Sequence, residues 1–359
     1  MSFIEKWFAG KKTGENISPD LLNKVLETMR ESVIVVGEDT RILSSNRAAY
    51  DAFARKNGAL AGKRLSEVIR DLTLHKAFEK ALGEGGSSDI EMEISGVEKR
   101  KYDAHIAPIQ FGETKGAIGV FYDITQIARL ENVRQEFLSN ISHELRTPLT
   151  SILAFVETLE DGAIRDEENN RHFLSVIRRN AERMHRLIDD ILELSTIESG
   201  RIALDIKKIN LSGVITEIFT NLSGKAGERK IKLINAIGDE VFVAADLVRL
   251  EQMLTNLIDN AVKFNRDEGE VVVRHAQNAD GSDVISVADT GEGISGEHRE
   301  RIFERFYRTD RARSREIGGT GLGLAIVKHL ARLHEGEISV ASNVGEGTTF
   351  LLELPVKPA

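Results

Sequence analysis

Two stretches in the middle of the chain carry apolar residues at helical spacing. In the first, apolar positions recur every three or four residues from Phe137 to Leu159, which predicts a long helix over residues 126–160 that ends at Asp161-Gly162. In the second, the positions are spaced alternately four and three: Phe173, Ile177, Asn180, Met184, Leu187, Ile191 and Leu194. This spacing is typical of a helical bundle, so residues 126–200 are predicted to form a hairpin that pairs with a second copy to bury both seams.

Asn180 is the polar residue within the second seam. A buried asparagine at such a position can fix the register of a helical bundle. A solvated position at the frayed end of the seam explains it equally well, and the sequence leaves both interpretations open.

Residues 20–125 alternate short apolar runs with turn residues. Helices are predicted at Leu21–Met29 and Asn46–Phe53. Strands are predicted at Ser32–Val36, Ile42–Leu43, Ile90–Ile94, Tyr102–Ile109 and Gly116–Tyr122. Together they predict a small antiparallel sheet with one covered face. Residues 1–19 are expected to be a frayed terminus, with contact to a membrane surface as the alternative.

Residues 205–356 alternate strand and helix patterns and are rich in glycine, which predicts a second globular domain. The whole chain of 359 residues is therefore expected to be an α+β multidomain protein. Its net charge of −9 argues against nucleic-acid binding driven by overall charge. The chain has no cysteine, which excludes disulfides, thiolate metal sites, cysteine nucleophiles and flavin–thiol adducts.

No apolar run approaches the ~18–20 residues that a membrane-spanning helix needs. We therefore expect a cytoplasmic protein. A protein held at the membrane by its partners, or by an anchor that precedes this sequence, would show the same pattern.

The run Ser142–Leu149 places a histidine beside a carboxylate on the first long helix. His143 lies two residues from both Ile141 and Leu145, which puts it roughly 200° around the helix from the buried seam, so its imidazole should point outward. Pro148 lacks the amide that would pair with the carbonyl of Glu144, and a kink is expected there. A zinc-binding HExxH motif is excluded because Thr147 stands where the second histidine would be.

A second candidate site lies on a helix of the C-terminal domain. Asn256, Asn260 and Lys263 share one face at i, i+4 and i+7, opposite an apolar face. Two amide oxygens and an ammonium group suit Mg²⁺ and phosphate. Taken alone, such a stripe is more often a solvated helix face.

Two glycine-rich segments follow this helix. Asp289-Thr290-Gly291-Glu292-Gly293 comes directly after an apolar strand, where a carboxylate can accept a hydrogen bond from an exocyclic amine such as that of adenine. Gly319-Thr320-Gly321-Leu322-Gly323-Leu324 opens a helix whose free amides favour phosphate. It is not a dinucleotide-binding fingerprint, because arginines rather than a strand precede it.

Seven arginines lie between Arg299 and Arg315, mixed with Phe303, Phe306 and Tyr307. They predict either a lid whose cations contact phosphate or a mobile, solvated segment. Each of these motifs is ambiguous alone, but their joint occurrence in this order predicts a nucleotide site.

The order of motifs resembles the sensor histidine kinases. The C-terminal domain is similar to their ATP-binding domain, with N, G1, F, G2 and G3 boxes at Asn256–Phe264, Asp289–Gly293, Phe303–Tyr307, Gly319–Leu324 and Gly345–Phe350. The stretch Phe137–Leu149 resembles their H box. Phe121–Thr125 and Asn46–Ala49 resemble parts of a PAS sensor domain, and the kinase core is most like the phosphate-regulon sensor group.

The resemblance implies a fold for each segment. Residues 1–19 would precede a PAS-like α/β sensor over 20–125. Residues 126–200 would form the dimerisation and phosphotransfer hairpin, a four-helix bundle in the homodimer. Residues 205–356 would form an α/β-sandwich ATP-binding domain of the histidine-kinase and Hsp90-like ATPase type.

The resemblance also implies an ATP-dependent protein-histidine kinase that phosphorylates His143 and passes the phosphoryl group to a response regulator receiver domain. Glu144 would accept a hydrogen bond or a proton from the imidazole. Thr147 would orient water for a phosphatase activity. ATP and Mg²⁺ are the implied cofactors, and no direct nucleic-acid binding is implied.

The implied nucleotide contacts are shared among the boxes. Asn260 would ligate Mg²⁺ with Asn256 nearby, Lys263 would contact phosphate, Phe264 would flank the base, and Asp289 would bind the adenine amine. The remaining implied contacts are Gly291, Gly293, Arg308, Gly319, Thr320, Gly321, Leu322 and Gly323.

Two rival functions come from other classes. An ATPase switch of the chaperone or mismatch-repair type would carry a glutamate one turn before the metal-binding asparagine, where this chain has Asn256. A non-catalytic scaffold would carry degenerate boxes, and these boxes are intact. The input signal and any PAS ligand cannot be read, since His75 and His105 are more often structural than haem ligands in such a fold.

Overall fold

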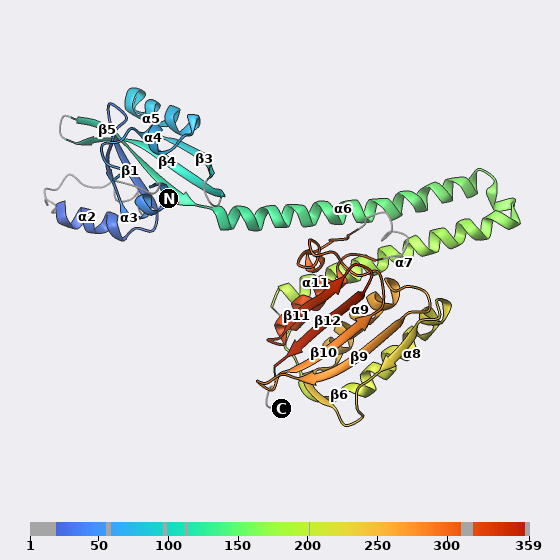
Figure 1. Ribbon diagram of the computed structural model, residues 1–359. Coiled ribbons are helices and arrows are strands. Elements are labelled where there is room, and N and C mark those ends of the chain that lie inside the picture. The colour runs from blue at the N-terminus through green and yellow to red at the C-terminus, as the bar shows by residue number, and fades with distance from the viewer. Residues whose placement is uncertain are drawn as a thin grey trace. The chain divides into compact units, whose positions relative to one another are not determined.

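The computed structural model describes residues 19–54, 59–95, 99–111, 114–200, 202–309 and 319–355. The chain divides into two compact units, Met1–Glu136 and Phe137–Ala359 (Figure 1). Apart from Pro19, the segment expected to be a frayed terminus lies outside the described residues.

The first unit is built on a five-stranded antiparallel sheet with the order β2-β1-β5-β4-β3 (Figure 1). Its strands are β1 (Ser32–Gly37), β2 (Ile42–Ser45), β3 (Ser88–Ser95), β4 (Lys99–Phe111) and β5 (Thr114–Asp123). Its helices are α2 (Pro19–Thr28), α3 (Arg47–Phe53), α4 (Leu65–Val68) and α5 (Leu72–Glu84). Helix α5 packs on β3, β4 and β5. The prediction of a small antiparallel sheet with one covered face is confirmed.

Aromatic side chains fill the interior of this unit. Phe53 packs against Tyr102 and Phe121, with ring centroids 5.3 and 5.2 Å apart. Phe78 of α5 is fully buried and lies over Gly119 of β5, where an added Cβ would come within 2.6 Å of its ring. Because the core is closely packed, the Phe78 side chain cannot shift to make room for an added Cβ at Gly119.

Gly119→Ala should therefore destabilise the first unit, by about 1–3 kcal/mol for an overpacked core. The matched control is Gly83→Ala in α5, where an added Cβ meets nothing within 4 Å. That substitution should stabilise α5 by up to about 1 kcal/mol because alanine is the better helix former. Hydrogen exchange of the β4 and β5 amides measures both effects. Equal protection in the two variants would contradict the expected packing.

The two histidines of this unit both have protein partners. His75 Nε2 lies 2.8 Å from the carbonyl oxygen of Ile69, and the exposed His105 pairs with Asp89 at 2.5 Å. These contacts favour the structural interpretation of both residues over haem ligation.

The second unit contains most of a helical hairpin, whose first helix starts within the last residues of the first unit. Helix α6 (Thr125–Glu160) and helix α7 (Glu167–Glu198) are joined by a turn and the 3₁₀ helix η1 (Ala163–Arg165). The predicted hairpin and its break at Asp161-Gly162 are confirmed. Helix α6 continues through Pro148 without interruption, and the kink expected there stays a prediction. No described helix is long and apolar enough to cross a membrane.

A row of large apolar side chains remains exposed on the hairpin: Leu138, Leu149, Leu153, Leu174, Ile188 and Leu192. Such a row is what an unpaired second seam would leave. Asn180 of the seam is partly buried, and its amide donates hydrogen bonds to Ser151 Oγ of α6 at 3.3 Å and to the Val176 carbonyl at 2.9 Å. Asn180 thus links the two helices of one hairpin.

The rest of the second unit is a sheet covered on one face by three helices (Figure 1). Strands β7 (Lys232–Asn235), β9 (Glu270–Gln277), β10 (Asp283–Asp289), β11 (Glu337–Asn343) and β12 (Gly347–Leu354) pair in the order β11-β12-β10-β9-β7, and only β7 and β9 are parallel among the described pairs. The covering helices are α8 (Leu211–Glu228), α9 (Leu247–Lys263) and α11 (Gly323–Leu333). Strands β6 (Ile206–Asn210) and β8 (Phe242–Asp246) form a separate pair, and η2 spans Arg301–Phe303.

Candidate functional site

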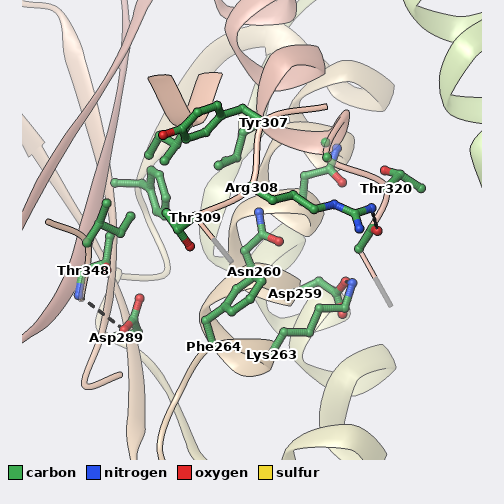
Figure 2. Close-up of a pocket in the computed structure, with 18 of the residues that line it drawn as sticks. Asp259, Asn260, Lys263, Phe264, Asp289, Tyr307, Arg308, Thr309, Thr320 and Thr348 are labelled. Carbon is green, nitrogen blue, oxygen red and sulfur yellow. Dashed lines mark hydrogen bonds and ion pairs between the residues drawn. The ribbon is translucent and has the colours of Figure 1, made fainter. Parts of the chain in front are cut away.

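A cavity of about 540 Å³ opens in the second unit between α9, the glycine-rich segments and α7 (Figure 2). Most of the residues expected to contact a nucleotide line it: Asn256, Asn260, Lys263, Phe264, Asp289, Gly293, Arg308, Gly319, Thr320, Gly321 and Gly323. Gly291 and Leu322 do not line it. Residues from four separate segments therefore converge on one site.

Helix α9 presents its polar face to this cavity. Asp246 caps the helix by accepting a 3.1 Å hydrogen bond from the Arg249 amide. Its apolar face is buried in the core of the domain through Leu250, Met253, Leu254, Leu257, Ile258, Ala261 and Val262. Burial of that face turns Asn256, Asn260 and Lys263 together into the cavity, as their spacing predicts.

A carboxylate missed by the sequence analysis holds the lysine. Asp259 Oδ2 lies 2.5 Å from Lys263 Nζ, and its Oδ1 accepts from Lys225 at 3.0 Å. Burial opposes ionisation of Asp259, but the two ammonium groups outweigh it, so the pKa of this carboxyl lies below its usual value. A matching i, i+4 spacing of Asp259 and Lys263 was the available sequence signal.

Asp289 stands at the end of β10, where its carboxylate faces the cavity near Phe264 (Figure 2). Its Oδ1 accepts hydrogen bonds from the amides of Gly291 at 2.8 Å and Thr348 at 3.3 Å. Burial raises the pKa of Asp289 to about 6, although both amides act in the opposite direction. Gly291 is required beside it, because an added Cβ would lie 2.3 Å from the Phe264 carbonyl oxygen.

The second glycine-rich segment is tied to the segment that contains Phe306. The Phe306 amide donates to the Gly321 carbonyl at 2.9 Å, and the Arg308 guanidinium donates to the Gly319 carbonyl (Figure 2). Gly321 has φ +77°, and an added Cβ would lie 2.9 Å from Phe306 Cα. Leu322 is fully buried at the start of α11, which explains why its side chain does not reach the cavity.

Four of the seven arginines can be described, and each contacts protein groups. Arg299 donates to Asn343 at 3.0 Å, and Arg301 lies over the Tyr307 ring at 4.4 Å. Arg305 pairs with Glu198 of α7, and Arg308 lies 3.5 Å from Glu144 of α6. Arg311, Arg313 and Arg315 lie outside the described residues, so the expected lid stays a prediction.

His143 is exposed on α6, as predicted from its distance to the seam. One turn later the exposed Thr147 donates its hydroxyl to the His143 carbonyl at 3.2 Å. Glu144 instead accepts from Arg183 of α7 at 2.9 Å and lies near Arg308, and no hydrogen bond joins it to the imidazole in the part of the chain that the structure describes. None of His143, Glu144 and Thr147 lines the cavity.

The structure adds side chains from α7 to the cavity that the sequence analysis did not identify. Arg186, Asp189 and Asp190 all line it. The Thr320 hydroxyl donates to Asp190 Oδ2 at 2.7 Å. The seam pattern of α7 places these residues outside the apolar positions but carries no signal for what they contact.

Three sequence profiles match consecutive parts of the chain. They are a PAS fold over residues 26–129, a His Kinase A (phospho-acceptor) domain over 133–200, and a histidine kinase-, DNA gyrase B- and HSP90-like ATPase over 245–358. These matches confirm the predicted fold classes.

Three curated relatives match as well. A sensor protein kinase WalK from Staphylococcus aureus is 33% identical over 343 residues, which cover 93% of this chain and 80% of the relative. The sensor histidine kinase WalK of Bacillus subtilis (strain 168) is 31% identical, covering 94% of this chain and 55% of the relative. The sensor protein SrrB of S. aureus (strain N315) is 28% identical, covering 98% of this chain and 58% of the relative. The chain thus spans little more than half of the latter two.

Among solved structures, a histidine kinase ThkA in complex with a response regulator protein TrrA shares the fold. The match has a TM-score of 0.52 and 23% identity, and it covers 93% of this chain and 98% of that one. A histidine kinase AdeS of Acinetobacter baumannii matches with a TM-score of 0.51 and 23% identity over 60% of this chain and 98% of that one.

Proposed function

This chain belongs to the PAS-containing sensor histidine kinases of two-component systems, and we propose that it phosphorylates His143 from Mg²⁺-ATP and passes the phosphoryl group to an aspartate of a response regulator. The observation that carries this proposal is the convergence of Asn260, Lys263 and Asp289 on one cavity. A carboxylate for the adenine amine, an aromatic ring for the base and polar groups for phosphate are all present there.

The donor set of the cavity fits Mg²⁺. Asn256 and Asn260 both face it, and neither side-chain amide makes a hydrogen bond to another described residue. Gly323 leaves room beside Asn256, since an added Cβ would lie 3.2 Å from its Oδ1. Mg²⁺ prefers oxygen ligands and takes few from the protein when phosphates supply the others. When bound, it neutralises charge on the phosphates.

Phosphoryl transfer requires the protein to position the reacting groups more than to take part in covalent chemistry. The unprotonated imidazole nitrogen of His143 attacks the γ-phosphorus, the bond to the β-phosphate oxygen breaks, and ADP leaves. The proton on the other imidazole nitrogen passes to Glu144 or to water. Because Glu144 pairs with Arg183 and lies near Arg308, it must leave these partners to serve this role.

We assign the dimer to the exposed apolar row of the hairpin, because a second hairpin would cover Leu149, Leu153 and Leu192. The domain boundaries follow the same reasoning: residues 20–125 for the sensor, 126–200 for the phosphotransfer hairpin and 205–356 for catalysis.

A single incubation with γ-labelled ATP and Mg²⁺ tests the proposed function against its rivals. Acid-labile, alkali-stable label on the protein supports the kinase. Released phosphate without labelled protein would support an ATPase switch, and the absence of both would support a scaffold. Glutamate is missing one turn before Asn260, where Asn256 stands, so we expect little released phosphate.

We further propose that the protein removes the phosphoryl group from its response regulator. Thr147 is exposed one turn from His143, where its hydroxyl can orient water. Thr147→Ala should lower phosphatase activity about 10–100-fold while changing autophosphorylation less than about threefold. Loss of label from a phosphorylated receiver domain measures the first rate, and initial labelling of the kinase measures the second. An equal loss of both would contradict the assignment, and Thr147→Ser should retain both activities.

A further inference from the structure

Helix α7 places an acidic side chain inside the nucleotide cavity. Asp190 lines the cavity, and its Oδ2 accepts the 2.7 Å hydrogen bond from the Thr320 hydroxyl. Thr320 belongs to the glycine-rich segment that leads into α11, the segment expected to bind phosphate. We call this contact between α7 and residues 319–322 the docked contact.

The docked contact uses the one hydrogen of the Thr320 hydroxyl. The hydroxyl donates its single hydrogen to Asp190 and accepts from the Leu322 amide at 3.3 Å. A hydroxyl has one hydrogen to donate, so it cannot also donate to a phosphate oxygen. The Leu322 amide at the start of α11 donates to the Thr320 hydroxyl oxygen. Asp190 thus takes the hydroxyl donor that a phosphate would use.

The surroundings of Asp190 leave its negative charge poorly compensated. Burial raises the pKa of Asp190 above its usual value, and the neighbouring Glu193 and Asp189 raise it further, while Thr320 and Lys263 lower it. Lys263 is the cation that lowers this pKa, but its ammonium is 2.5 Å from Asp259. Further negative charge brought close to Asp190 is repelled by its carboxylate.

We propose that Asp190 sets the affinity of the cavity for polyphosphate: in the docked contact it occupies the Thr320 hydroxyl and repels the terminal phosphates of ATP and ADP. This inference rests on the proposed nucleotide site. Nucleotide binding and the docked contact oppose each other, so by linkage each weakens the other by the same factor. Asp190 is a specificity-determining residue, because the penalty falls on phosphates and spares the adenine and ribose.

Calorimetric titration of the full chain with adenosine, Mg²⁺-ADP and Mg²⁺-ATP tests the proposal. Asp190→Asn keeps an oxygen that can accept from Thr320 but removes the charge. It should bind ADP and ATP about tenfold more tightly and leave the affinity for adenosine unchanged. Glu182→Gln removes the same charge from an exposed position of α7 outside the cavity and should change none of the three affinities.

Any other set of changes in the three affinities would overturn the proposal. Unchanged or weaker binding of ATP by Asp190→Asn would mean that the carboxylate is neutral to the nucleotide or assists Mg²⁺. Equal tightening for all three ligands would mean that the whole cavity has changed. Failure of the proposed function itself looks different, because the unmodified chain would then bind neither ADP nor ATP.

Discussion

Asp289→Asn is expected to weaken nucleotide binding strongly and, at the same time, to make the nucleotide-free protein more stable at neutral pH. Oδ1 of Asp289 is held by the amides of Gly291 and Thr348, so the asparagine oxygen takes that place. The NH₂ group of the asparagine then takes the place of Oδ2 and would face the adenine amine. Both groups are hydrogen-bond donors, so the hydrogen bond to adenine would be lost. We expect the affinity for ATP and ADP to fall about 10²–10³-fold.

The gain in stability follows from the same carboxylate. The pKa of Asp289 is about 6 in the folded chain against a reference of 3.8. Because the folded-state pKa lies above the unfolded one, ionisation of Asp289 costs its full amount of stability above about pH 6, and this cost disappears as the pH falls from about 6 to 3.8. The difference between the two pKa values corresponds to about 3 kcal/mol at pH 7.5, the upper bound for what asparagine restores.

Thermal unfolding with and without Mg²⁺-ADP measures both effects. Asp289→Asn should raise the melting temperature of the nucleotide-free protein by several degrees at pH 7.5, show little gain near pH 4, and give no further increase with ADP. Asp280→Asn is the control, because the hydrogen bonds from Ser282 lower the pKa of Asp280 and its neutralisation should bring no gain. A lower melting temperature for Asp289→Asn would refute the assigned cost of burial.

His143→Gln is expected to reduce autophosphorylation at least about 10⁴-fold, because an amide offers no nucleophilic nitrogen in place of the imidazole. His143 is exposed and does not line the cavity, so nucleotide affinity should stay within about twofold of the unmodified chain. Incorporation of label from γ-labelled ATP measures the rate. His172→Gln, an exposed position on α7, should label normally, and residual labelling of His143→Gln would identify a different acceptor.

The hairpin and the shared polar face of α9 could be predicted because each depends on local spacing. The seam of α7 and the shared face of Asn256, Asn260 and Lys263 follow from 3.6 residues per turn, and both are found in the structure. Helical spacing also predicts that His143 points away from the seam of its helix, and the residue is exposed in the structure.

Helix α5 is missing from the predicted elements, although local residues mark both of its ends. Asp71 caps it by accepting from the Leu74 amide at 2.8 Å, and Gly85 ends it at φ +69°.

Other features depend on segments that meet only in the folded chain. The contact of Asp190 with Thr320 joins positions 130 residues apart. No periodicity within α7 could indicate that contact, because it depends on the packing of the hairpin against α11.

Identification of the phosphorylated side chain tests the central claim most directly. The chain has nine histidines, so chemistry of the linkage alone does not name the acceptor. After incubation with Mg²⁺-ATP, peptide mapping at alkaline pH is expected to place a single acid-labile phosphoryl group on His143. A phosphoryl group on any other residue, or ATP hydrolysis with His143 unmodified, would contradict the account.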